Sequence, residues 1–353
     1  MYLEKLSNAF GVSGSEEDVR DLIVEIAKPY VDEWQVDTMG NLFITRQARR
    51  GVKTPSERVM VTAHMDEVGF LISKINNDGM LKFETIGGFD KRILLGKSLV
   101  IGKNHIPGVI GLKPIHLLDY DERGNVPSIE SMYIDVGASN KSGTKVSIGD
   151  SATFATQFSY LGATLIEADL PPKQGRVKGK AFDDRVGCAI LLELLKDEYD
   201  FDLIAVFTVQ EEIGVRGAKV AAYSANPDIA IVLECTAADD LPRANEDDEI
   251  GIPRLGDGPA ITVMDRTVIA SRMLIDLLTE TATSEGIPYQ FKRPGIGGTD
   301  AKEIHLARSG IPSAVVSVPA RYIHAPAAIL DLADFWHTVE LVQATLERLP
   351  IQI

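Results

Sequence analysis

The strongest constraint on the fold is the alternation of strand-like and helical segments in the second half of the chain. Continuous apolar runs predict buried strands at residues 203–209, 229–233 and 314–318. Apolar residues that recur every three or four positions predict helices at residues 185–196, 268–284 and 332–349. Apolar strands with helices between them are typical of a sheet that is covered on both faces. We therefore predict an α/β fold with a mixed sheet and helices on both faces.

The first 67 residues fit the same architecture. Ser15 precedes three acidic residues and an apolar repeat of helical period, which predicts an amphipathic helix capped by Ser15. Residues 36–45, broken by Gly40-Asn41, predict a hairpin, and residues 59–63 predict a short buried strand that runs directly into His64.

Residues 69–160 have a different pattern. Short β-type runs are separated by many glycines, and no long helical period is present. We predict that residues 1–67 and 161–353 form one α/β domain and that residues 68–160 form an inserted β-barrel-like domain.

Composition limits the partners and the compartment. Lys and Arg number 36 and Asp and Glu number 51, which gives a net charge of −15 and disfavours nucleic acid or an anionic membrane as the partner. The N-terminus lacks the basic start and apolar run of a signal peptide. No apolar stretch approaches the roughly 18 to 20 residues of a membrane helix. Two cysteines, Cys188 and Cys235, are too few for a disulfide framework, so we expect a cytoplasmic protein.

Polar side chains lie directly after the predicted strands. His64, Asp66 and Glu67 follow the first of them, and the others are followed by Glu211 and Glu212, by Glu234, and by a loop that holds His324. In open α/β sheets, binding sites form outside the carboxyl ends of the strands, so residues far apart in the sequence converge there. Asp183 and Asp184, at the start of a predicted helix, can join this group.

A set of carboxylates in one crevice requires compensating cations, because the carboxylates otherwise repel and take up protons. Imidazole and carboxylate ligands without thiolate suit zinc, cobalt or manganese. The alternative is that these residues have only structural roles. Glu211-Glu212 would then form a solvated turn, His64 would be a structural histidine, and Asp183-Asp184 would cap a helix. The spacing alone leaves a dinuclear metal hydrolase and a non-catalytic α/β domain as equal alternatives.

Two further patterns carry less information. His105, His116, His305 and His337 have no set of carboxylates at ligand-like positions, and we predict structural or surface roles for them. Residues 295–300 resemble a phosphate-binding loop only superficially, because the Lys-Ser/Thr that should follow is missing, so we predict a substrate-facing loop and no cofactor-binding residues there.

Five motifs occur in order along nearly the whole chain. They are Ala63-His64-Met65-Asp66-Glu67-Val68-Gly69, Gly179-Lys180-Ala181-Phe182-Asp183-Asp184-Arg185, Gln210-Glu211-Glu212-Ile213-Gly214, Gly298-Thr299-Asp300-Ala301 and Arg321-Tyr322-Ile323-His324. At these residues the sequence resembles the tetrahedral aminopeptidase family of dinuclear metallo-aminopeptidases. This family includes glutamyl and deblocking aminopeptidases and CelM-type proteins that are named endoglucanases.

The resemblance implies a fold of the zinc-peptidase type and a role for each matched residue. One divalent ion, zinc or cobalt, would be held by His64, Asp183 and Glu234. A second ion would be held by Asp183, Glu212 and His324, with Asp183 as the bridge. Glu211 would be the general base and Asp66 would orient the His64 ring. The family usually has Asp where this chain has Glu234, which offers the same oxygens on a longer side chain.

The resemblance also implies an assembly. The inserted β domain would mediate dimers, and the dimers would form a hollow tetrahedral dodecamer. We therefore expect a metal-dependent aminopeptidase that acts on peptides and forms a homo-oligomer. The alternatives are an endoglucanase-type glycoside hydrolase, which needs two carboxylates and no metal, and an inactive assembly protein of the same fold. The preferred N-terminal residue is not fixed, because its pocket falls in loops at residues 246–258 and 293–299.

Overall fold

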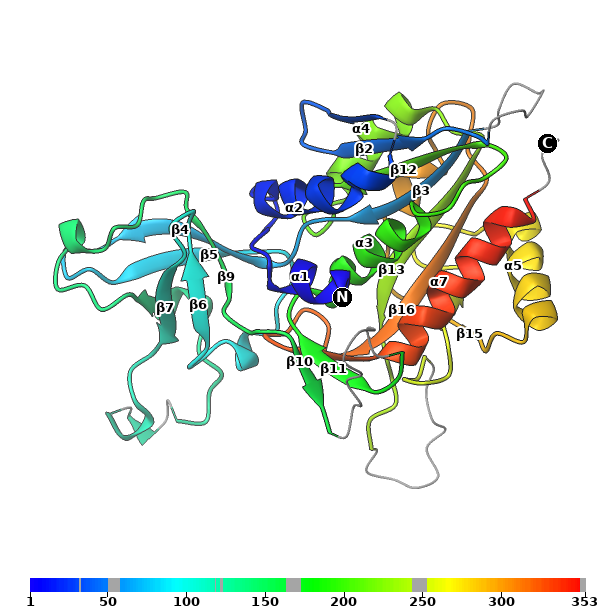
Figure 1. Cartoon of the computed structure of the whole chain (residues 1–353). Helices are drawn as coiled ribbons and strands as arrows, with labels where there is room; N and C mark the ends of the chain where they lie inside the picture. Colours follow the sequence, from blue (N-terminus) through cyan, green and yellow to red (C-terminus); the bar gives the residue numbers. More distant parts are fainter. Residues whose placement is uncertain are drawn as a thin grey trace.

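The computed structural model describes residues 1–31, 33–49, 58–117, 119–120, 123–162, 173–242 and 253–349. An α/β body and a separate small barrel lie side by side in Figure 1, with the barrel drawn in cyan and green. The body is built on an 11-stranded mixed sheet with the main order β1-β2-β12-β3-β13-β16-β17-β11-β10. This confirms the predicted α/β class with a mixed sheet.

The centre of the sheet consists of parallel strands that are buried on both faces. They are β3 (Arg58–His64), β12 (Asp202–Thr208), β13 (Ile229–Ala237) and β16 (Ser313–Arg321). Antiparallel strands extend the sheet on either side: β1 (Glu33–Val36), β2 (Leu42–Arg46), β10 (Ser159–Leu161), β11 (Arg176–Gly179) and β17 (Ala328–Asp331). β14 (Ala260–Thr262) pairs with β16 and with β15 (Gln290–Phe291).

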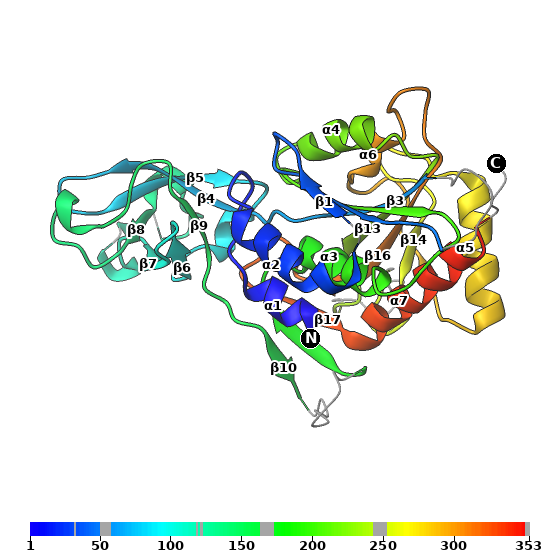
Figure 2. The same cartoon turned by 45° about the horizontal axis from the view of Figure 1, so that its top comes forward.

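Helices cover both faces of the sheet, as Figure 2 shows. One face packs against α1 (Tyr2–Asn8), α2 (Glu17–Ala27), α3 (Phe182–Leu194), α5 (Arg272–Glu285) and α7 (Leu332–Glu347). The other face packs against α4 (Arg216–Ala225) and α6 (Ala301–Ile304). Successive side chains of a strand point to opposite faces, so Ile231 and Leu233 of β13 enter the first core and Ala230 and Val232 enter the second. Continuous apolar runs therefore form these strands.

The inserted segment closes into a barrel with a hydrophobic core of its own. Its strands, in the order β4-β5-β8-β7-β6-β9, are β4 (Gly69–Ile75), β5 (Leu81–Ile86), β6 (Ser98–Ile101), β7 (Ile106–Gly111), β8 (Tyr133–Asp135) and β9 (Ser151–Phe154). Phe70, Phe83 and Phe154 pack edge to face in its centre. Phe70 pairs with Ala152, so the chain enters and leaves the barrel at adjacent positions.

Short 3-10 helices complete the structure. They are η1 (Lys28–Tyr30), η2 (Lys91–Ile93), η3 (Ile115–Leu117), η5 (Ile129–Ser131) and η6 (Lys141–Gly143). The domain limits at residues 68 and 160 stay a prediction, because strand pairing alone does not define a folding unit. The strand β10 pairs with β11 and so belongs to the large sheet.

Three predictions at element ends were wrong. The helix predicted from residue 268 begins at Arg272, as α5. α2 begins at Glu17 with Glu16 at its cap position, and the Ser15 hydroxyl instead lies 2.6 Å from the hydroxyl of Ser151 in the barrel. β13 continues to Ala237 because its backbone pairs with β16 as far as Ala320, so Glu234 lies within the strand and not after it.

Candidate metal centre

The parallel strands bring the predicted site residues to one edge of the sheet. β3 ends at His64, β12 ends just before the loop with Glu211 and Glu212, and β16 ends three residues before His324. Because β12, β3, β13 and β16 are neighbours, these ends lie next to each other. Asp183 reaches the same edge from the first turn of α3.

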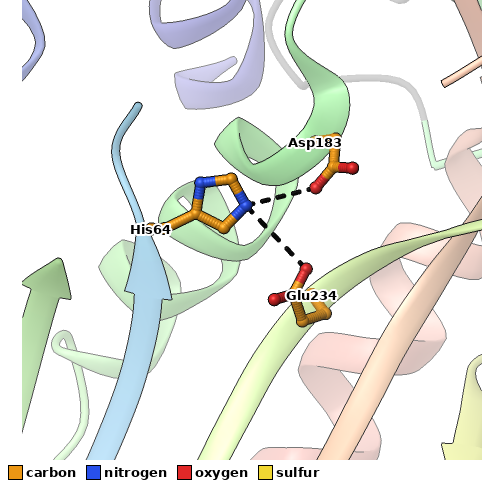
Figure 3. Close-up of side chains that lie close together, drawn as sticks. All are labelled: His64, Asp183 and Glu234. Atoms are coloured by element: carbon orange, nitrogen blue, oxygen red, sulfur yellow. Dashed lines mark hydrogen bonds and ion pairs between the residues drawn. The ribbon is translucent and has the colours of Figure 1, made fainter. Parts of the chain in front are cut away.

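The first group of candidate ligands consists of His64, Asp183 and Glu234. The Nε2 atom of His64 lies 3.2 Å from Asp183 Oδ1 and 4.0 Å from Glu234 Oε2. Figure 3 shows one ring nitrogen of His64 facing both carboxylates, which come from α3 and β13. The nearest ligand atoms of the three residues all lie within 4.8 Å of one another, a spacing at which one ion could contact all three.

The second group consists of Asp183, Glu212 and His324. The Nε2 atom of His324 lies 3.2 Å from Asp183 Oδ2 and 3.3 Å from Glu212 Oε1. Asp183 therefore belongs to both groups and presents a different oxygen to each histidine. A carboxylate that divides its oxygens in this way has the geometry of a bridge between two ions.

Burial and neighbouring charges strongly shift the pKa values of these residues. Burial, together with the charge of Asp183, raises the pKa of Glu212 to about 8. Burial and the nearby charge of Asp184 raise the pKa of Glu234 well above its usual range. Burial lowers the pKa of His324, but its hydrogen bond with Asp183 and the charge of Glu212 outweigh this effect and raise it to about 9. The site thus holds protons where a cation could replace them.

The residues fit a divalent metal ion by donor chemistry and by geometry. Glu212 Oε1 is buried and has no hydrogen-bond partner among the described residues, although it points toward His324. A metal ion would satisfy this oxygen. The donors are imidazole nitrogens and carboxylate oxygens, and the buried cysteines Cys188 and Cys235 belong to neither group. Such a set suits zinc, cobalt or manganese.

Asp66 connects the His64 ring to the neighbouring loop. The Nδ1 atom of His64 lies 3.2 Å from the Asp66 carbonyl oxygen and 3.4 Å from its carboxylate. The same carboxylate accepts hydrogen bonds from the backbone amides of Glu211 and Glu212, at 2.9 and 3.1 Å, and from the Ser13 hydroxyl at 2.6 Å. Asp66 thus holds both the second ring nitrogen and the loop that carries two of the predicted site residues.

Glu211 belongs to neither group of candidate ligands among the described residues. Burial raises the pKa of its carboxyl well above the usual range, opposed by His64 and reinforced by Asp300. Glu211 is therefore the sequence neighbour of the candidate ligand Glu212 without being a candidate ligand itself.

The contacts of Ser13 and Thr208 were not predicted from the sequence. The Thr208 hydroxyl donates to Asp300, which is fully buried at the start of α6. No local pattern marks a serine or threonine that reaches a distant carboxylate, so only the fold identifies these contacts. The remaining histidines lie in neither ligand group: His105 stacks on Phe10, and His305 Nδ1 lies 2.7 Å from the carbonyl oxygen of Ala301.

The family follows from comparison with known proteins. The family model described as M42 glutamyl aminopeptidase matches residues 40–341. The chain belongs to this family. It is therefore a member of an aminopeptidase family, as the five motifs predicted, and the aminopeptidase resemblance is confirmed.

Two relatives of the chain differ in the substrate that their names state. The chain is 32% identical to a lysyl aminopeptidase of Pyrococcus furiosus, over 98% of this chain and 96% of the relative. It is also 32% identical to a glutamyl aminopeptidase of Lactococcus lactis, over 98% and 95%. Equal similarity to both means that overall identity does not indicate the preferred residue.

Solved structures share the fold over nearly the whole chain. A TET aminopeptidase from a marine Thaumarchaeota archaeon superposes with a TM-score of 0.89 at 33% identity, over 99% of this chain and 96% of that one. The TET1 peptidase of Pyrococcus horikoshii, described as assembling into a tetrahedron or an octahedral shell, gives 0.82 at 32% identity over 97% of each chain. An endoglucanase of Thermotoga maritima gives 0.78 at 37% identity, over 99% and 97%.

Within the described residues, no helix is long and apolar enough to cross a bilayer.

Proposed function

We propose that this M42 protein is a dinuclear metallo-aminopeptidase that removes N-terminal residues from peptides. The observation that carries the proposal is the division of the Asp183 carboxylate between two histidines, with Oδ1 toward His64 and Oδ2 toward His324. His64, Asp183 and Glu234 would hold one divalent ion, and Asp183, Glu212 and His324 would hold the second. Three carboxylates against two divalent ions leave the site near neutrality when one further anion binds.

The chain's own residues would supply the proton chemistry. When bound, the two ions would polarise the scissile carbonyl and lower the pKa of the attacking water. Glu211 would accept a proton from that water and pass it to the leaving amine. Asp66 would keep the His64 ring in one orientation through Nδ1, which leaves Nε2 directed at the other ligands. The free α-amino group of the peptide would bind to an acidic group of the site, which restricts cleavage to the first residue.

Zinc or cobalt is the proposed metal, since both accept imidazole and carboxylate in open coordination. We also propose a homo-oligomer in which the barrel at residues 68–160 mediates dimers. The homo-oligomer is supported by the P. horikoshii TET1 peptidase, which can assemble into a tetrahedron or a large octahedral shell. Part of the loop that we expect to shape the substrate pocket, residues 246–252, lies outside the described residues.

A second candidate activity, glycoside hydrolysis, is suggested by the name of the T. maritima structure. One experiment separates the two activities. Metal-free protein is reconstituted with zinc or cobalt and tested on a panel of aminoacyl chromogenic substrates and on a soluble glucan. Aminopeptidase activity that is lost in a chelator and restored by metal supports the proposal. Glucan cleavage that survives the chelator would contradict it, because a glycosidase carboxylate pair needs no metal.

A further inference from the structure

Glu67 is a buried carboxylate that the proposed chemistry does not use. Its exposed fraction is 2%, and both oxygens are occupied. Oε1 accepts a hydrogen bond from the Gly11 amide at 3.2 Å, and Oε2 accepts one from the Thr153 hydroxyl at 2.7 Å. The Lys180 ammonium donates to both oxygens, at 2.7 and 2.9 Å. A carboxylate with this many donors is fixed in position.

These contacts join two segments that carry candidate ligands. Glu67 lies three residues after His64, and Lys180 lies three residues before Asp183. Arg185, two residues after Asp183, adds two further links. Its Nη2 atom lies 3.4 Å from Glu67 Oε1, and its Nε atom donates to the Met65 carbonyl oxygen at 2.7 Å. The segment after β3 is therefore linked to the start of α3 on both sides of Asp183.

Glu67, Lys180 and Arg185 form a junction that also contacts other parts of the chain. Lys180 donates to the Ala9 carbonyl oxygen at 2.8 Å, and Arg185 donates to that of Leu6 and, at 3.2 Å, to that of Gly11. Thr153 belongs to β9, so the barrel contributes one contact. The junction thus connects the N-terminal segment, the barrel and both ligand-bearing segments.

Charge makes Glu67 the central member of the junction. Lys180 and Arg185 are buried, with exposed fractions of 3% and 0%, and Glu67 is the carboxylate that pairs with both. Breaking a buried ion pair from one side leaves an uncompensated charge, which is strongly destabilising. The two segments therefore keep their separation as long as the Glu67 carboxylate contacts both Lys180 and Arg185.

We propose that Glu67, paired with Lys180 and Arg185, is a positioning residue that sets the distance between His64 and Asp183 so that one ion can contact both. This inference rests on the proposed metal centre. It goes beyond that centre, because Glu67 lies outside both candidate ligand groups. Outer partners of metal ligands typically change metal affinity by about 10- to 100-fold when they are replaced.

The test uses cobalt(II) titrated into metal-free full-length protein and followed by visible absorption, which reports ligand geometry. Glu67→Gln removes the charge of the carboxylate, and Lys180→Met removes the Lys180 link while Glu67 keeps Arg185 as a partner. Asp334→Asn is the matched control, because Asp334 is a buried carboxylate that accepts hydrogen bonds from the Gly256 and Gly258 amides and belongs to neither ligand group.

We expect either Glu67→Gln or Lys180→Met to lower the affinity for one of the two cobalt(II) ions by about 10- to 100-fold and to change the absorption spectrum of that ion. The other ion should change less, because Glu212 and His324 come from other strand ends. Asp334→Asn should bind both ions as the unaltered protein does. Unchanged affinity and spectrum in folded Lys180→Met would overturn the inference and leave the proposed function intact. Failure of the unaltered protein to bind cobalt(II) would overturn both.

Discussion

The Asp183 carboxylate lies between two histidines, with Oδ1 3.2 Å from Nε2 of His64 and Oδ2 3.2 Å from Nε2 of His324. The histidines come from opposite ends of the sequence and meet because β3 and β16 flank β13 in the sheet. The next residue, Asp184, accepts a hydrogen bond from the Gly187 amide at 2.9 Å and so caps the helical part of α3. Of these two adjacent aspartates, one is therefore a candidate metal ligand and the other is a helix cap.

Asp183→Ala should lower the affinity of both metal ions, because a bridging ligand is lost from both. His64→Ala should chiefly lower the affinity for one of the two ions. Calorimetric titration of zinc into each metal-free variant measures this. Asp184→Ala is the control, and it should cost about 0.5 to 2 kcal/mol of stability, as the loss of a helix cap does, while two ions still bind. Two unaltered binding events in Asp183→Ala would show that the bridge is another residue.

Glu211→Gln should abolish turnover and leave both metal ions in place. The amide keeps the shape of the side chain but cannot accept a proton, and Glu211 lies in neither ligand group. Metal content by elemental analysis and rate on an aminoacyl substrate are measured on the same sample. A variant that loses its metal, or that retains the full rate, would contradict the proposed role.

Metal affinity should fall as the pH falls below about 9, and more steeply below about 8. In the metal-free site the pKa of Glu212 is raised to about 8 by burial and by Asp183, so it is protonated below that value and deprotonated above it. The pKa of His324 is about 9, so its proton must also leave when a metal ion binds at neutral pH. Binding therefore releases protons. For each proton released, the affinity falls by up to about tenfold for every unit by which the pH decreases. Zinc titrations in buffers of different ionisation enthalpy count these protons, and a count of zero would contradict the prediction.

Removal of the barrel should reduce the size of the oligomer. Phe70 and Ala152 are paired neighbours, so residues 69–155 can be replaced by a short linker that joins adjacent ends while β10 stays in the large sheet. Light scattering measures the mass, and cobalt(II) binding reports whether the metal centre survives. If the shortened protein folds and keeps the subunit number of the parent assembly, the barrel is not the assembly element.

Much of the fold could be predicted because the hydrophobic pattern follows directly from burial. The runs at residues 203–209 and 314–318 became β12 and β16, and the helical period near the C-terminus became α7. The end of β13 could not be predicted, because a polar residue at 234 normally marks the end of a buried strand. Pairing with β16 carries the backbone past Glu234 to Ala237. That tertiary contact outweighs the local pattern.

The sequence by itself determined the class of the protein: five motifs, spread over nearly the whole chain, identify an M42 aminopeptidase and contain all its candidate site residues except Glu234. Only the tertiary structure decided which oxygen of Asp183 faces which histidine and which of two adjacent aspartates caps α3. It also decided that Glu67 joins the two ligand-bearing segments through Lys180. The physical reason is that a motif records which residues are present, whereas hydrogen bonds and metal contacts depend on distances of about 3 Å between atoms that only the folded chain brings together.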